Sequence, residues 1–162
     1  MTTRRKKGSY FQLAEGTPAP LVVRVESRVN FNEVDVMGIV WYGRYSVFLE
    51  EGSAELGRRC GLSYKDFADA NLAAPIAQFH IDYHRPLALD EVFTITASLV
   101  WSEGARLNTE YSMAKEDGSI AATAYTVQMF IRGVSGEACF TSPELLEQLR
   151  TRWKAGELSW LK

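Results

Sequence analysis

Apolar residues recur at helical spacing between Tyr45 and Cys60, and no other stretch of the chain constrains the fold as strongly. The positions that share this face are Tyr45, Phe48, Leu49, Gly52, Leu56 and Cys60. Glutamates lie early in the stretch, Arg58 and Arg59 lie in its last turn, and Gly61 suits the residue at which a helix stops. A helix with one apolar face has to bury that face against another layer. The remainder of the chain is therefore expected to cover it.

Five stretches alternate between apolar and polar residues, which is the period of half-buried β-strands. The first, from Leu21 to Phe31, precedes the helix and places one set of side chains on a common face: Leu21, Val23, Val25, Val29 and Phe31. The other four follow the helix, at residues 77–84, 92–101, 106–115 and 119–132. Asp117-Gly118 between the last two predicts a tight hairpin.

Two shorter helices complete the pattern. Ser63 with Asp66 three residues later resembles a capping box for a helix that reaches about Ala70. Ser142-Pro143-Glu144 predicts a C-terminal helix with proline at its first position. The order of elements favours an α+β fold, in which a curved antiparallel five-stranded sheet wraps around one long central helix and a further helix follows at the C-terminus.

Length and composition suggest one soluble domain. The 162 residues are 46% hydrophobic and 23% charged, and the net charge of -2 gives no reason to expect nucleic acid or a membrane surface as partner. No apolar run is long enough to span a bilayer, and two distant cysteines, Cys60 and Cys139, fit a reduced cytoplasmic setting. Residues 1–20 are expected to form a flexible basic tail, which could also fold back on the body or touch an anionic ligand. Residues 21–140 are expected to form the main domain, and residues 141–162 are expected to form a C-terminal helix and tail packed on it.

Several common catalytic motifs are missing from the sequence. The segment Gly133-Val134-Ser135-Gly136 lies in a loop without the helix that a nucleophile elbow requires, and no glycine-rich phosphate loop appears. His80 and His84 would lie about 13 Å apart on one strand at ~3.3 Å per residue, which is too far for a shared metal ion. These histidines and Asp82 are therefore expected to be structural or solvent-facing, and no metal is expected.

Two carboxylates, Glu33 and Asp35, stand between the first strand and the long helix. They could cap backbone N–H groups in a turn. Alternatively, one carboxylate attacks a carbonyl, or activates a water that does, while amides at the helix N-terminus hold the oxyanion. Such a site suits a thioester, because an alkyl thiol with a pKa of about 8.5 departs without a strong general acid.

Residues 33–45, EVDVMGIVWYGRY, resemble the signature D-x-D-x-x-G-x-V-[YW]-[HYF]-x-N-Y of hotdog-fold acyl-CoA thioesterases of the 4-hydroxybenzoyl-CoA and Tol–Pal-associated type. The resemblance covers roughly residues 21–140 and implies hydrolysis of an acyl-CoA, with a carrier-protein substrate as an alternative. It assigns Asp35 as nucleophile or general base and the amide of Tyr42 as the group that polarises the carbonyl. The positions that it places against the substrate are Gly38, Val40, Trp41, Gly43 and Tyr45.

The resemblance also implies a homodimer or homotetramer, with no cofactor. Glu33 and Arg44 depart from the aspartate and asparagine of the signature, and Arg44 could be exposed or meet a ligand phosphate. Tyr42 replaces the histidine usual in the Tol–Pal branch, and residues 39–42 lean toward the aromatic-acyl branch. Two other functions stay open on the same fold: a non-catalytic acyl-CoA-binding or regulatory module, and a hydratase.

Overall fold

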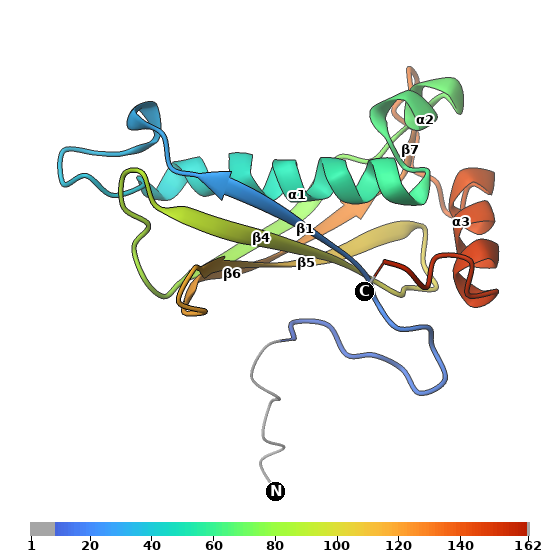
Figure 1. Cartoon of the computed structure of the whole chain (residues 1–162). Helices are drawn as coiled ribbons and strands as arrows, with labels where there is room; N and C mark the ends of the chain where they lie inside the picture. Colours follow the sequence, from blue (N-terminus) through green and yellow to red (C-terminus); the bar gives the residue numbers. More distant parts are fainter. Residues whose placement is uncertain (1–8, 162) are drawn as a thin grey trace, which may run out of the picture.

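The computed structural model describes residues 9–161. Strand β1 (Leu21–Arg28) leads through two 3-10 turns, η1 (Phe31–Glu33) and η2 (Tyr42–Arg44), into the long helix α1 (Tyr45–Cys60). The elements that follow are α2 (Tyr64–Asp69), β2 (Leu72–Ala73), β3 (Ile76–Tyr83), β4 (Val92–Val100), β5 (Arg106–Lys115), β6 (Ile120–Met129), β7 (Ile131–Arg132) and α3 (Glu144–Lys154). Figure 1 shows α1 lying across one face of the sheet.

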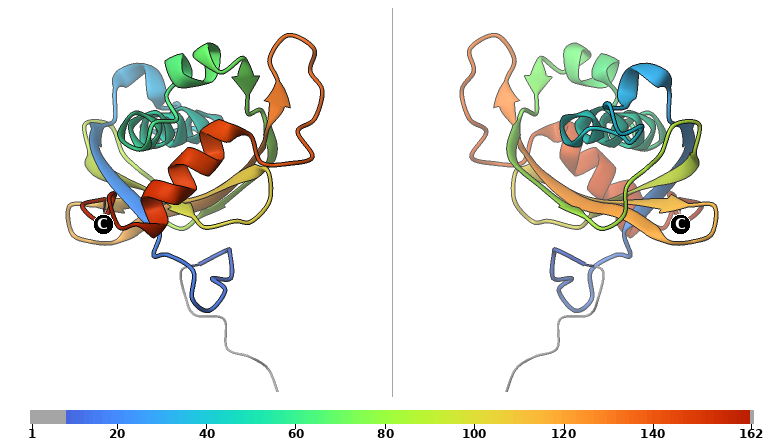
Figure 2. Two further views of the ribbon diagram at one scale, coloured as in Figure 1. Left: turned by 90° about the vertical axis from the view of Figure 1, so that its right-hand side faces the viewer. Right: turned by 90° about the vertical axis from the view of Figure 1, so that its left-hand side faces the viewer.

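The main sheet has five antiparallel strands in the order β1-β4-β5-β6-β3. Seen along α1, the sheet curves around the helix, and α3 lies across one end of it (Figure 2). The predicted α+β hotdog architecture is confirmed. A second, two-stranded sheet of β2 and β7 was not predicted, because strands of two residues carry no periodic signal.

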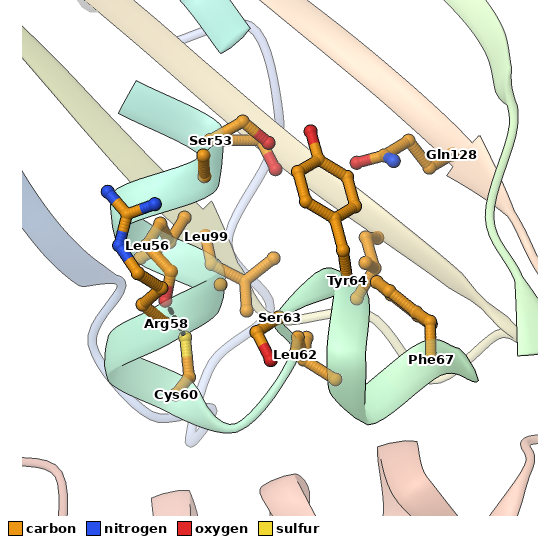
Figure 3. Close-up of a pocket in the computed structure, with 14 residues that line it drawn as sticks. Ser53, Leu56, Arg58, Cys60, Leu62, Ser63, Tyr64, Phe67, Leu99 and Gln128 are labelled. Atoms are coloured by element: carbon orange, nitrogen blue, oxygen red, sulfur yellow. Dashed lines mark hydrogen bonds between the residues drawn. The ribbon is translucent and has the colours of Figure 1, made fainter. Parts of the chain in front are cut away.

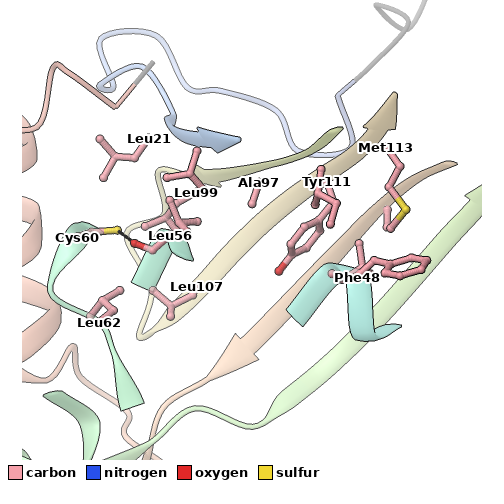
Figure 4. Packing of buried hydrophobic residues seen from close by; sticks show 14 of the residues in the cluster. Leu21, Phe48, Leu56, Cys60, Leu62, Ala97, Leu99, Leu107, Tyr111 and Met113 are labelled. Carbon is pink, nitrogen blue, oxygen red and sulfur yellow. Dashed lines mark hydrogen bonds between the residues drawn. The ribbon is translucent and has the colours of Figure 1, made fainter. Parts of the chain in front are cut away.

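The buried face of α1 packs on the middle strands of the sheet. Phe48 and Leu56 of the helix share one apolar cluster with Ala97, Leu99 and Tyr111 of β4 and β5 (Figure 4). The Cys60 thiol donates a hydrogen bond to the Leu56 carbonyl at 2.7 Å. Burial raises the pKa of this thiol to about 12, so it stays protonated and structural.

Gly52 lies where α1 packs closely against β4 of the sheet. A Cβ at this position would lie 3.0 Å from Ile95 Cγ2 and 3.2 Å from the Ala97 Cβ. We expect Gly52→Val to lower the free energy of unfolding by about 1–3 kcal/mol, because the extra methyl groups have to push the helix off the sheet. Urea unfolding followed by circular dichroism measures this. An unchanged urea midpoint would mean that the helix and sheet can move apart without loss of stability.

Three boundaries differ from the sequence-based expectation. The first strand ends at Arg28, and Phe31 lies 82% exposed in η1 rather than on the buried face. The last predicted strand is broken at Phe130, where the chain leaves the main sheet and β7 pairs with β2. Pro143 caps α3 instead of occupying its first turn, since its carbonyl accepts the Leu146 and Glu147 amides at 3.0 and 3.1 Å.

The predicted stops and turns are present. Gly61 ends α1 with a φ of 81°, and the Ser63 hydroxyl accepts the Asp66 amide to start α2. Gly118 has a φ of 80° in the hairpin between β5 and β6, where its amide donates to the Lys115 carbonyl at 2.9 Å. These helix ends and turns depend on residues that are close together in the sequence, so they can be predicted without the tertiary structure.

The N-terminal segment lies on the sheet face opposite α1 (Figure 2). The Tyr10 hydroxyl donates to Asp82 Oδ2 at 2.6 Å, and the Tyr10 and Phe11 amides donate to Glu110 Oε1 at 2.6 and 2.7 Å. The tail therefore folds back on the body at these residues, while its basic run at residues 4–7 lies outside the described part of the chain. On the same polar face, the Tyr10 ring packs edge-on against His80 at 5.6 Å, and the His80 side chain remains 46% exposed.

Candidate functional site

The segment from Glu33 to Trp41 forms a short hairpin at the N-terminal end of α1. Val34 and Val40 face each other across its stem, and the Trp41 amide donates to the Glu33 carbonyl at 3.2 Å. At the tip, the Gly38 amide donates to the Asp35 carbonyl at 3.0 Å, and Gly38 takes a φ of 74° that glycine adopts without strain. The returning half of the hairpin ends at Trp41, directly before η2 and α1, so Asp35 and the start of the helix belong to one short segment.

A second segment holds the hairpin from the other side. The Val40 amide donates to the Leu87 carbonyl at 2.9 Å, and the Leu89 amide donates to the Gly38 carbonyl at 3.0 Å. Leu87 is fully buried, so the hairpin is attached to the core through the connection between β3 and β4. Only its tip, at Val36 and Met37, projects outward.

Asp35 is half-buried at the base of this tip. Its Oδ1 accepts the Met37 amide at 2.8 Å, which is an Asx turn within the hairpin. Among the hydrogen bonds of residues 9–161, none involves Oδ2. The carboxylate thus has one oxygen fixed by its own turn and one oxygen available to an incoming group.

The start of η2 offers amides to the same end of the molecule. The hydrogen bonds of the described chain give no acceptor to the Tyr42 or Gly43 N–H, as expected for the first turn before a helix. The Tyr83 hydroxyl donates to the Tyr42 carbonyl at 2.8 Å, and the Tyr83 ring packs edge-on against Tyr45 at 5.0 Å. These contacts hold the peptide unit formed by the Tyr42 carbonyl and the Gly43 N–H.

The other predicted substrate-binding residues divide into two groups. Val40 and Tyr45 are 5% and 3% exposed and belong to the core. Trp41 is 44% exposed, and a Cβ on Gly43 would lie 2.1 Å from its ring, so glycine lets the indole fold over the turn. The structure therefore places Trp41, Gly43 and Gly38 at the surface of the site and the other two beneath it.

A groove of about 360 Å³ runs between α1 and β3. It begins at Ser46 and Val47 in the first turn of α1 and is lined further along by Glu50, Phe79 and Tyr64. A deeper cavity of about 90 Å³ adjoins it near Cys60 (Figure 3). Figure 3 shows the Tyr64 ring between Ser53 of α1 and Gln128 of β6, and these three residues line both spaces.

Asp35 is not among the residues that line these spaces. The candidate acid therefore lies outside both the groove and the cavity. The groove is open along β3, where Ile76 and Phe79 are 58% and 46% exposed. The sequence did not identify Tyr64 and Phe79 as residues that line the groove, or Tyr83 as the partner of the Tyr42 carbonyl. An aromatic residue in a short helix or an alternating strand is equally typical of ordinary core packing.

The remaining sequence-predicted candidates fall on the outer face of the sheet. His80 Nε2 lies 3.0 Å from Asp82 Oδ2, and His84 Nε2 lies 2.9 Å from Thr123 Oγ1. Within residues 9–161, histidine, cysteine and acidic side chains form no cluster of three that could hold a metal ion. Across those residues, no helix is both long and apolar enough to cross a membrane.

The curved sheet around one long helix, with a carboxylate in a hairpin before that helix, defines an α+β protein of the hotdog class. The sequence profile of the thioesterase-like superfamily matches residues 29–149, and the chain belongs to this superfamily. A provisionally named esterase of Aquifex aeolicus is 29% identical over 123 residues, which cover 76% of this chain and 94% of that protein.

Solved structures agree with this fold. The DHNA-CoA thioesterase of Staphylococcus aureus superimposes with a TM-score of 0.74 at 18% identity, over 86% of this chain and 95% of that one. A second Staphylococcus aureus protein, solved in complex with CoA, gives a TM-score of 0.73 at 19% identity, over 91% and 89% of the two chains.

Proposed function

We propose that this protein hydrolyses an acyl-CoA thioester to a free acid and CoA, with Asp35 as the nucleophile or general base. The Tyr42 amide, with that of Gly43 beside it, holds the oxyanion as the carbonyl carbon is attacked. The CoA thiolate then leaves without a strong general acid, because the pKa of an alkyl thiol is only about 8.5 and its thiolate is a weak base. Family membership supports a thioester hydrolase as the general class, and a structural neighbour with bound CoA supports a CoA-type substrate.

The observation that carries the proposal is a half-buried carboxylate with one unoccupied oxygen, in a hairpin that returns to unpartnered amides at the start of a helix. The positive end of the helix macrodipole favours negative charge there, both on the carboxylate and on the developing oxyanion. Removing one oxyanion donor typically costs about 2.7–4 kcal/mol in activation energy. Two free amides and a helix end therefore supply a substantial part of the catalysis.

The acyl group lies in the groove between α1 and β3, because the groove begins one residue after the first residue of α1. Aromatic acyl-CoAs are the first substrates to test, since residues 39–42 resemble that branch. The adjoining cavity near Cys60 offers room for longer aliphatic groups. A carrier-protein thioester is the alternative donor.

We further propose that a second copy closes the site through β3. This strand is an edge of the sheet, and β6 is its pairing partner within the described chain. The other edge, β1, is partly covered, because the Val22 amide donates to the Leu161 carbonyl at 3.3 Å. An exposed edge with apolar side chains is a template for pairing with another chain.

Phe79→Lys tests this assembly. We expect a charged side chain on the α1-facing side of β3 to dissociate the dimer, and we expect activity per chain to fall with the dimer fraction. Gln78→Lys is the matched control, since the neighbouring residue points to the opposite face of the strand. Analytical ultracentrifugation reports the mass of each variant. A wild-type chain that is monomeric and active would refute the assembly.

Release of free thiol from a panel of aromatic and aliphatic acyl-CoAs tests the hydrolytic function itself. Rapid thiol release from one class of substrate is the expected result. A second candidate is a non-catalytic acyl-CoA-binding module, favoured by the hydrogen bond that Asp35 makes within its own turn. Tight binding of acyl-CoA by calorimetry, with no thiol released from any substrate, would establish that alternative instead.

A further inference from the structure

Glu33 is a buried acid beneath the hairpin that carries Asp35. It is 3% exposed, and its carboxylate is fully engaged. Oε2 accepts the Asn30 amide at 2.8 Å, while Oε1 accepts Arg44 Nε at 3.2 Å and Nη2 at 3.0 Å. The Glu33 side chain thus connects Asn30, two residues after β1, with Arg44, the last residue before α1.

Arg44 is the basic partner of Glu33 in this ion pair. Its position in η2 is two residues after Tyr42, and its amide donates to the Trp41 carbonyl at 3.0 Å. Its guanidinium also lies near Glu51, a half-buried acid whose pKa is raised, chiefly by burial and partly by the charge of Glu33, while Arg44 opposes that shift. Arg44 therefore compensates the charge of two acids, and its side chain remains 29% exposed.

The pair connects the two halves of the candidate site. Asp35 lies two residues after Glu33, and the Tyr42 amide lies two residues before Arg44. The distance between acid and amide has to be held closely, since a misplacement of ~1 Å can cost about a hundredfold in rate. Two N–H groups of the half-buried Arg44 guanidinium donate to one oxygen of the buried Glu33 carboxylate. This two-point contact resists such a shift better than a single hydrogen bond.

We infer that the Glu33–Arg44 ion pair sets the position of Asp35 relative to the oxyanion amides, and that both are positioning residues for the reaction. The inference rests on the proposed hydrolytic function. It predicts that loss of the pair slows turnover without weakening substrate binding, because neither side chain contacts the groove in which the acyl group lies.

Arg44→Gln tests the inference. We expect kcat to fall by about 10–100-fold with KM changed less than about threefold. Arg44→Lys keeps the charge without the two-point contact and should recover part of kcat. Because both single changes break the same contact, the Glu33→Gln/Arg44→Gln double variant should lose no more than the worse single variant. Amide hydrogen exchange at residues 35–41 should accelerate in Arg44→Gln.

Two controls separate positioning from general stability. Arg150 is 7% exposed and pairs with Glu147 in α3, whose side chain is 55% exposed, so Arg150→Gln also removes a buried arginine from an ion pair. Glu55→Gln breaks exposed pairs with Arg58 and Arg59 on the same helix as the site. Compared at temperatures where each variant is folded, neither should alter kcat or the exchange of residues 35–41.

Equal loss of kcat in Arg150→Gln and Arg44→Gln would overturn the inference, as would unchanged kcat and unchanged exchange in Arg44→Gln. If the wild-type protein hydrolyses no thioester, the proposed function fails, and the exchange measurement alone decides whether the pair holds the hairpin. Faster exchange confined to residues 35–41 would then support the structural half of the inference. Unchanged exchange would refute it.

Discussion

Asp35→Asn should abolish thioester hydrolysis while acyl-CoA still binds. The amide side chain keeps an oxygen that can accept the Met37 N–H, so the turn at the hairpin tip survives. It cannot act as a base or as a carboxylate nucleophile. We expect kcat to fall by about 10²–10⁴-fold if Asp35 is a general base, and further if it forms a covalent acyl intermediate. Thiol release measures the rate, and calorimetry with acyl-CoA measures binding.

Asp69→Asn is the matched control for this change. Asp69 is an exposed acid that pairs with Lys65 at the end of α2 and lies outside the hairpin, so its variant should hydrolyse thioesters at the wild-type rate. Trapping with hydroxylamine distinguishes the two roles of Asp35, since only a covalent intermediate can be captured on the chain. An Asp35→Asn protein with full activity would remove the carboxylate from the mechanism altogether.

Phe48→Ala should cause the largest loss of stability. Phe48 is fully buried in α1, and its ring packs edge-on against Phe93 of β4 at 4.9 Å and against Tyr45 at 6.0 Å. Truncation removes this contact between helix and sheet and leaves a cavity that the curved sheet can close only partly. We expect the free energy of unfolding to fall by about 3–5 kcal/mol. Denaturant unfolding measured by tryptophan fluorescence checks the size of the effect.

The same substitution elsewhere provides the comparison. Phe140 is 96% exposed in the loop before α3, so Phe140→Ala should change stability by less than about 0.5 kcal/mol. A loss of similar size in both variants would mean that packing under α1 does not dominate the stability of the fold. A small loss in both would mean that the core repacks around a missing ring.

Much of the fold could be predicted because its signals are local. The period of the apolar residues identified α1 and the five strands, and single residues such as Gly61 and Ser63 marked the ends of helices. Boundaries failed where tertiary contacts decide the path of the chain. Phe31 continues the alternating pattern, yet the strand has already ended, because the backbone hydrogen bonds to residues 90 and 91 stop at Val29 and the chain then turns into η1.

The same distinction between local signals and tertiary contacts applies to the candidate site. The spacing of Asp35, Gly38 and Tyr42 within one short segment predicts a candidate site just before α1, and the structure places these three residues in the hairpin and the turn that precede the helix. The partners of that segment come from distant positions: Leu87 holds the stem, and Tyr83 holds the Tyr42 carbonyl. Their distance in sequence leaves no periodic or spacing signal.

By itself, the sequence determined that a helix with one apolar face would lie against an antiparallel sheet, with an acid placed just before the helix begins. Repeating patterns and turn residues suffice for this, because they act over a few neighbouring positions. The tertiary structure decided that Glu33 and Arg44 pair beneath the acid, that Tyr10 docks on Asp82, and that β3 is left as an open edge. Such features depend on which side chains meet after the sheet has curved around the helix, and that is fixed by packing in three dimensions.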